Sequence, residues 1–160
     1  MSYISKIDLS SETRASSITL LQVSLASAID LSLQVKQAHW NIKGMNFIAL
    51  HKYLDELHES VNSFVDTLAE RITAFSGLAE GSLAQVTEKT TLTSYPTKEL
   101  IAEGHLEALT TSIANLGAYI RKAIDISADK GDAGTSDIFT EISRELDHNL
   151  WLLEAHLKIK

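Results

Sequence analysis

Long, nearly uninterrupted helical periodicity most limits how this chain can fold. Apolar residues recur every three or four positions through most of the sequence, which is the spacing of amphipathic α-helices. The 160 residues include one proline and seven glycines, so few positions favour turns or breaks. The pattern predicts an all-α chain with four long helices.

Turn and capping residues set the expected limits of the first two helices. Ser10 or Ser11 can cap the first helix. Residues 43–46 form a short turn that joins it to an antiparallel second helix. That second helix is expected to end at Ser76 and Gly77.

The second half of the sequence contains a long connection and two more helices. The connection of about twenty residues, 78–97, is long for a helical bundle. We expect a short helix at 82–88, a third long helix from Pro96, and a turn at 130–134 before the fourth. A crossover of this length fits an up-down-down-up arrangement, in which it travels the length of the bundle.

Two pairs of potential metal ligands lie on the predicted second helix, His51 with Asp55 and Asp66 with Glu70. Members of a pair are four residues apart, so their side chains meet on one helix face. The pairs begin about 22 Å apart along the axis, too far for one cluster. However, positions 51 and 70 share the midpoint 60.5 with positions 55 and 66. Antiparallel copies related by a two-fold axis there would bring one pair from each subunit together.

The helical wheel favours the same split site. The apolar face of the second helix is about 100° wide, and the ligand-type side chains begin about 40° beyond its edge. They border the core, whereas a di-iron site within a single bundle points its carboxylates inward. On the first helix, His39 ends an apolar seam, and reflection about the turn brings it level with His51. We predict that His39 joins His51 and Asp55 within one subunit. Asp66 and Glu70 would come from its neighbour.

Two imidazoles and three carboxylates suit a first-row metal with open coordination positions, above all iron, whereas zinc needs fewer ligands. Each residue also has an ordinary alternative. His39 could be a hydrogen-bonded core histidine, and His51 with Asp55 could be a surface pair of small energetic value. Glu70 beside Arg71 could be charge patterning. The mirror-symmetric spacing of the whole set favours the metal site.

The sequence around these residues resembles the Dps family (DNA-binding protein from starved cells), the miniature ferritins. The resemblance is carried by K-Q-A-H-W-N-x-K-G at 36–44, N-F-x-A-L-H at 46–51 and D-x-x-A-E-R at 66–71. It extends weakly over nearly the whole chain, through residues 94–96, 121–124 and 150–151. It implies a single ferritin-like four-helix bundle over 1–160, with a short tail at 1–10. Twelve such subunits would form a hollow shell.

The resemblance also implies an activity. Family members are ferroxidases that oxidise Fe(II), preferably with hydrogen peroxide rather than oxygen, and store the ferric product, which protects the cell and its DNA from oxidative damage. The family's iron ligands correspond to five residues here. They are His39, His51, Asp55, Asp66 and Glu70.

Trp40 and Asp137 each have both a functional and an ordinary interpretation. Trp40, next to His39, could act as a redox-active indole near the iron or simply pack at the helix end. Asp137 matches a family position that lines iron-entry pores, but an aspartate in the first turn of a helix is also favoured by the helix dipole. Asp125, Asp129 and Asp132 lie around the same turn but do not align confidently with pore positions. Trp151 is expected to pack.

The composition bears on the cellular compartment and on whether the chain spans a membrane. Without cysteine the chain forms no disulfides, which is compatible with the cytoplasm, the compartment we expect. Neither a secretory signal nor an apolar stretch of about 18 residues is visible, so no membrane span is expected.

DNA compaction on the nucleoid is the alternative function, and a purely structural bundle is a third. The net charge is −7, with Lys6 alone before the first helix and Lys158 and Lys160 at the other end. Since DNA affinity depends on phosphate neutralisation, this predicts weak DNA binding.

Overall fold

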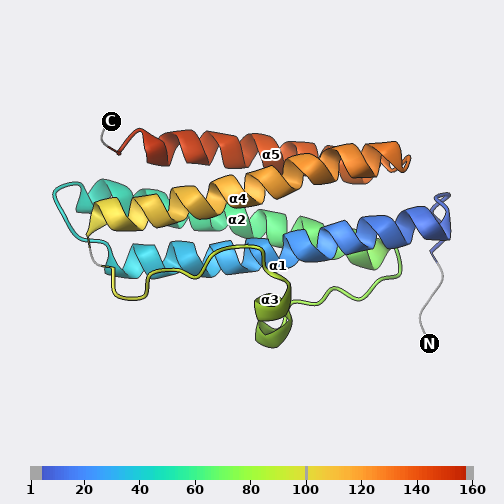
Figure 1. The fold of residues 1–160 in the computed structure, drawn as a ribbon, viewed down its shortest axis with the longest axis horizontal. Helices are drawn as coiled ribbons and strands as arrows, with labels where there is room; N and C mark the ends of the chain where they lie inside the picture. The colour runs from blue at the N-terminus through green and yellow to red at the C-terminus, as the bar shows by residue number, and fades with distance from the viewer. Residues whose placement is uncertain (1–4, 100, 158–160) are drawn as a thin grey trace.

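The computed structural model describes residues 5–99 and 101–157. The regular structure of this part is helical apart from one isolated bridge. The helices are α1 (Ser11–Asn41), α2 (Phe47–Ala74), α3 (Leu83–Lys89), α4 (Ala102–Asp129) and α5 (Ala133–Glu154). The four long helices pack side by side, which confirms the predicted all-α bundle (Figure 1).

The helices follow the predicted up-down-down-up order. α1 and α2 form an antiparallel hairpin, and the crossover that carries α3 returns along α1 to the end of the bundle where α1 finished (Figure 1). There the Ala102 amide donates a hydrogen bond to the Lys43 carbonyl at 3.2 Å. α4 therefore starts beside the C-terminal end of α1, and α5 returns antiparallel to α4 (Figure 1).

α1 is buried on two sides, because the crossover covers the side that the bundle leaves open. Gln22 accepts a hydrogen bond from the Glu80 amide and donates one to the Glu80 carbonyl, at 3.0 and 2.6 Å. Asp30 accepts from the Thr90 hydroxyl at 2.7 Å. Gln34 donates to the Thr93 carbonyl at 3.2 Å. These side chains of α1 hold the crossover against the helix, two through its backbone and one through a side-chain hydroxyl.

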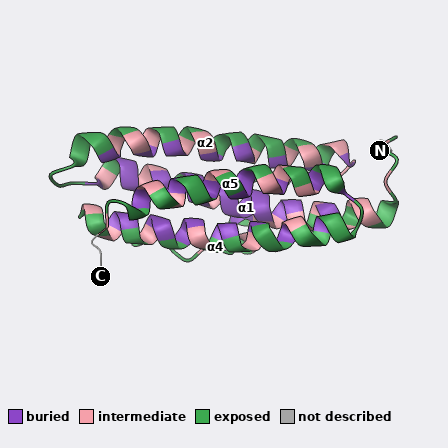
Figure 2. Ribbon diagram, turned by 90° about the horizontal axis from the view of Figure 1, so that it is seen from above, coloured by how far each residue is buried: buried purple, intermediate pink, exposed green. Residues whose placement is uncertain are grey.

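One contiguous apolar core runs along the inner faces of the long helices, as the buried stripes in Figure 2 show. The predicted α2 face is buried at Leu54, Leu57, Val61, Leu68 and Ile72, each at most 1 % exposed. The outward faces of α2 and α5 are largely exposed in the single chain (Figure 2).

The ends of the helices differ in part from the sequence expectation. Ser10 caps α1 by accepting a hydrogen bond from the Thr13 amide, as predicted. A capping box at Ser82 starts α3, which lies within one residue of the short helix expected at 82–88. The third long helix was expected to start at Pro96, but it starts at Ala102. Ile101 is held extended by its bridge to Lys43, which delays the helix.

By length and composition alone, α1 could cross a membrane, with an 18-residue window of mean hydropathy 1.5. No membrane span was expected from the sequence, because serines and glutamines interrupt the apolar residues of this helix. However, 61 % of that window is buried inside the protein. The apolar character of α1 is therefore that of a core helix.

Candidate metal centre

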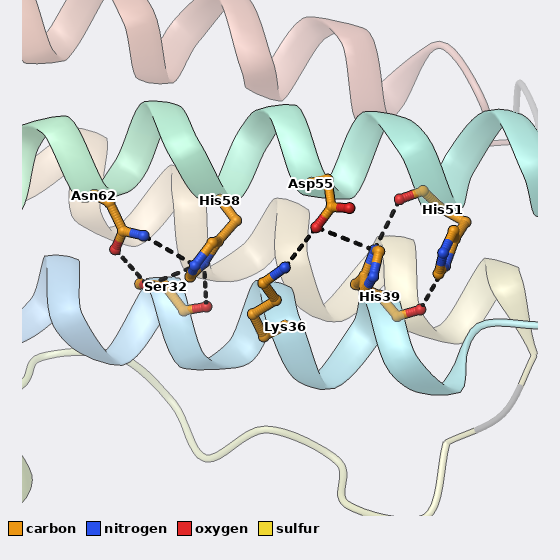
Figure 3. A network of polar contacts seen from close by, with 7 residues as sticks. All are labelled: Ser32, Lys36, His39, His51, Asp55, His58 and Asn62. Carbon is orange, nitrogen blue, oxygen red and sulfur yellow. Dashed lines mark hydrogen bonds and ion pairs between the residues drawn. The ribbon is translucent and has the colours of Figure 1, made fainter.

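The α1–α2 hairpin brings His39 and His51 into direct contact. Their rings stack with centroids 3.8 Å apart and planes inclined by 19°. Nδ1 of His39 lies 2.8 Å from the His51 carbonyl oxygen, and Nδ1 of His51 lies 3.0 Å from the His39 carbonyl oxygen. The two side chains thus bridge the helices reciprocally (Figure 3).

This reciprocal pairing determines which ring nitrogen can bind a metal. A carbonyl oxygen only accepts hydrogen bonds, so Nδ1 must carry the proton in both rings. In a neutral imidazole, Nε2 is then unprotonated and able to act as a ligand. Metal-binding histidines usually donate their other N–H in this way, which fixes the tautomer and the ring orientation.

Asp55 lies beside the two histidines and is engaged by Lys36. Its Oδ1 accepts a hydrogen bond from Lys36 Nζ at 2.5 Å and lies 3.6 Å from His39 Nδ1 (Figure 3). The Lys36 hydrogen bond lowers the pKa of Asp55, and the charges of His39, Lys36 and His51 add to this effect against a desolvation penalty. The carboxylate is therefore ionised and ready for a cation, but a lysine competes for it.

Asp66 and Glu70 lie apart from this group on the same helix. Both are exposed, about one helical turn from each other. Asp66 is eleven residues beyond Asp55, which corresponds to about 16 Å along α2. Across residues 5–99 and 101–157, no three His, Asp or Glu side chains are placed to hold a metal ion. His39, His51 and Asp55 are neighbours in the single chain but do not have the geometry of a metal site there, and Asp66 and Glu70 are exposed.

Between Asp55 and Asp66 along α2, Ser32, His58 and Asn62 form a closed cycle of hydrogen bonds. The His58 Nδ1–H lies 3.1 Å from the Ser32 hydroxyl and 3.3 Å from the Ser32 carbonyl oxygen. His58 Nε2 lies 2.9 Å from Asn62 Nδ2, and Ser32 donates to Asn62 Oδ1 at 2.9 Å (Figure 3). Because both nitrogens of His58 are engaged, this histidine has a structural role.

Comparison with known proteins identifies the family. A model described as a ferritin-like domain matches residues 18–160. The DNA protection during starvation protein of Agrobacterium fabrum is 47 % identical over 155 residues, covering 97 % of this chain and 96 % of that protein. The chain belongs to the Dps family of ferritin-like proteins.

Solved Dps structures share the fold over nearly the whole chain. Mycobacterium smegmatis Dps matches with a TM-score of 0.94 and 29 % identity, covering 99 % of this chain and 96 % of that one. Dps from Microbacterium arborescens in its high iron form matches with a TM-score of 0.87 and 30 % identity, covering 96 % and 98 %. The ferritin-like fold that the sequence predicted is confirmed.

At the far end of α2, this Dps chain contains a second buried polar group that the sequence analysis missed. Asp132, 1 % exposed, accepts hydrogen bonds from Arg71 at 2.9 Å, Ser17 at 2.6 Å and the Thr135 amide at 3.0 Å. Arg71 also stacks over the Phe75 ring, 4.2 Å from its centroid. Burial alone would raise the pKa of Asp132, but the hydrogen bonds and the Arg71 charge outweigh it and lower the pKa.

This group ties the C-terminal end of α2, where Glu70 lies, to the start of α5. It also removes Asp132 from the acidic residues that could line a pore. Asp137 lies in the second turn of α5, beyond the first turn in which it was expected, and it is exposed. Its role in a pore stays a prediction. The sequence signal for Arg71 was only its place in the D-x-x-A-E-R motif.

The two tryptophans are exposed in the single chain. Trp40 is 69 % exposed at the end of α1, beside His39 in sequence. Trp151 is 62 % exposed, with its ring 5.8 Å from that of His148. The expectation that Trp151 packs is therefore wrong for the single chain, because it lies on the outward face of α5.

Proposed function

We propose that this Dps protein is a ferroxidase and iron-storage subunit, with Fe(II) as its substrate. It would oxidise iron, preferably with hydrogen peroxide, at sites shared between two subunits, and store the ferric product in a hollow shell of twelve subunits. The reciprocal His39–His51 pair beside Asp55 is the observation that carries this proposal. A Dps structure described as a high iron form supports it.

Each ligand has a distinct part in this proposal. The fixed tautomers of His39 and His51 present Nε2 to the ion, and Asp55 adds a charged oxygen once Lys36 releases it. Asp66 and Glu70 of the neighbouring subunit complete the set. Carboxylate oxygens stabilise Fe(III) more than Fe(II), which makes the oxidation easier. Two iron ions that pass one electron each to the same peroxide reduce it to water, which avoids the hydroxyl radical.

Oxidation of Fe(II) by peroxide would protect DNA even if the protein does not bind DNA, because the reaction consumes both Fe(II) and peroxide. The curated relatives carry the name DNA protection during starvation protein. DNA binding by the protein itself is expected to be weak, because the formal net charge is −7 per chain. Arg14 donates to the Ile7 and Leu9 carbonyls at 3.0 Å, which holds it against its own chain. Lys158 and Lys160 lie outside the described residues. We place the shell in the cytoplasm, in keeping with a sequence that lacks cysteine.

The size of the native particle, together with its iron content, tests this function. The protein is loaded anaerobically with Fe(II), treated with peroxide, and separated by size-exclusion chromatography with light scattering. We expect a twelve-subunit particle that retains many ferric ions per subunit. A stable monomer or dimer, or iron that is lost from the protein during separation, would contradict the proposal.

A further inference from the structure

Tyr95, which is half-buried, and His105, which is buried, form an acid–base pair outside the proposed iron site. Tyr95 Oη lies 2.5 Å from His105 Nδ1, and the two rings stack with centroids 5.9 Å apart. His105 is 1 % exposed, and its Nε2 has no hydrogen-bond partner within residues 5–99 and 101–157. A phenol held this close to a buried imidazole has a proton acceptor already in place.

The protonation states of the pair suit proton transfer from the phenol. Burial lowers the pKa of His105, against an opposing influence of Glu99, so the imidazole is neutral at neutral pH. Burial, with the charge of Glu99, raises the pKa of Tyr95, so its hydroxyl stays protonated. In the tautomer that carries the imidazole proton on Nε2, the tyrosine hydroxyl donates and Nδ1 accepts.

The pair lies at the same level of the bundle as His39. Lys43 at the end of α1 pairs with Ile101 at the start of α4, and the two helices run antiparallel (Figure 1). Four residues back along α1 is His39, and four residues forward along α4 is His105. His39 and His105 therefore lie on neighbouring helices at about the same height along the bundle.

Tyr95 also borders a surface pocket of about 380 Å³. Gln34 of α1 and Glu107 of α4 line the same pocket. Small water-soluble molecules therefore have a route to the phenol ring in the single chain.

Tyr53 differs from Tyr95 in its hydrogen-bond partner, because the Tyr53 hydroxyl donates to the side-chain oxygen of Asn149 at 2.8 Å. An amide oxygen at that position cannot take up the phenolic proton.

We propose that Tyr95 and His105 form a proton-coupled electron donor that intercepts one-electron oxidants formed during iron oxidation. The role rests on the proposed function. When a single Fe(II) ion reacts with hydrogen peroxide, the products are Fe(III), hydroxide and a hydroxyl radical. That radical takes one electron from Tyr95 and becomes hydroxide. The phenolic O–H bond breaks, its proton moves to His105 Nδ1, and a tyrosyl radical remains. A small enediol reductant such as ascorbate returns the electron, and His105 returns the proton.

The pair is tested first in the iron-free shell, so that the result does not depend on ferroxidase activity. A light-excited ruthenium tris-bipyridine complex with a sacrificial electron acceptor serves as oxidant, and electron paramagnetic resonance detects tyrosyl radicals. Tyr95→Phe should lose the signal, whereas Tyr53→Phe should keep it. His105→Gln, which can accept a hydrogen bond but no proton, should also lose it. Radical formation in the wild type should slow in D2O. A signal unchanged in Tyr95→Phe would overturn the proposal, even if His105→Gln does not fold.

The second experiment adds Fe(II) and then hydrogen peroxide to the shell, and samples are frozen within the reaction. The wild type should show the same radical, absent in Tyr95→Phe, while both proteins form ferric iron at the same rate. Ferric iron without a Tyr95 radical would overturn this role and leave the proposed function intact. No ferric iron in the wild type would contradict the proposed function and remove the role, while the iron-free experiment would still report on the pair.

Discussion

His39 and His51 each donate the Nδ1 proton of the imidazole to the backbone carbonyl of the other. Each proposed ligand is thus the group that orients its partner, across the turn between α1 and α2. Loss of either side chain removes a ligand and the ring stacked against the other histidine, whereas the backbone carbonyl that holds the remaining ring is kept. The two histidines are expected to act as a unit.

The first prediction concerns this coupling. His39→Ala and His51→Ala should each lower the Fe(II) affinity by at least about 10–100-fold, the range seen when groups that orient ligands are lost. The double variant should be little worse than either single one, because the effects are not additive. Isothermal titration with Fe(II) under anaerobic conditions measures this. His58→Gln is the matched control and should bind iron as the wild type does. Fully additive losses would contradict the coupling.

The second prediction concerns Lys36, which competes with the metal for Asp55. Lys36→Met should tighten Fe(II) binding about two- to five-fold, since a partly exposed ion pair is a modest competitor. It should also raise the pKa of Asp55, because the Lys36 hydrogen bond is the largest cause of its lowering. Metal titration and carboxyl NMR check the two effects. Lys52→Met, which removes an exposed lysine from α2, is the control. Weaker binding by Lys36→Met would show that the lysine assists the site.

The third prediction concerns Asp132 and acid stability. Its pKa is lower in the folded protein, so it stabilises the fold above the ordinary pKa of an aspartate, about 3.9. This contribution should disappear as the pH falls below that value towards the pKa of the folded state. Asp132→Asn should cost about 1–3 kcal/mol at neutral pH, because Arg71 loses its charged partner. Urea unfolding at fixed protein concentration measures it.

The matched control for Asp132 is an exposed ion pair. Arg121 and Asp147 lie 2.8 Å apart, with side chains 50 % and 56 % exposed. Asp147→Asn should therefore change stability by less than about 1 kcal/mol, at any pH. Equal losses of stability in Asp132→Asn and Asp147→Asn would contradict the prediction that the buried Asp132 stabilises the fold more than an exposed ion pair does.

The fourth prediction is that the iron-free shell binds duplex DNA weakly at neutral pH. Each chain carries a formal charge of −7, and Arg14 is held by its own chain. A gel shift with plasmid DNA over a salt series tests this, because phosphate contacts give a steep salt dependence. Twelve C-terminal lysine pairs could still act together through multivalency, so retention of plasmid at about 0.15 M salt would favour DNA compaction.

Much of the fold could be predicted because periodicity and turns are local signals. The position of His39 opposite His51 followed from reflection about a short turn, and the structure places the two side chains there. The start of α4 could not be predicted, because the bridge between Lys43 and Ile101 joins residues far apart in sequence. Pro96 is a local signal that this contact overrides.

The contacts made by Lys36, Arg71 and Asp132 could not be predicted for a similar reason. Lys36 lies three residues before His39, on the same side of α1, but nothing in the sequence says that its ammonium group reaches Asp55 on another helix. Arg71 and Asp132 are sixty-one residues apart and meet only because α5 starts beside the end of α2. The roles of Asp66 and Glu70 depend on a second subunit, so a single chain leaves them as predictions.

The central claim, a metal site divided between two subunits, is tested most directly by mixing two inactive variants. One carries His51→Ala and Asp55→Ala, and the other carries Asp66→Ala and Glu70→Ala. The variants are unfolded together, refolded, and assayed for peroxide-dependent Fe(II) oxidation. A mixed dimer combines one intact half-site from each chain, so we predict activity in the mixture and none in either parent. Mixed particles, verified by mass spectrometry, that oxidise no more iron than the parents would contradict the divided site.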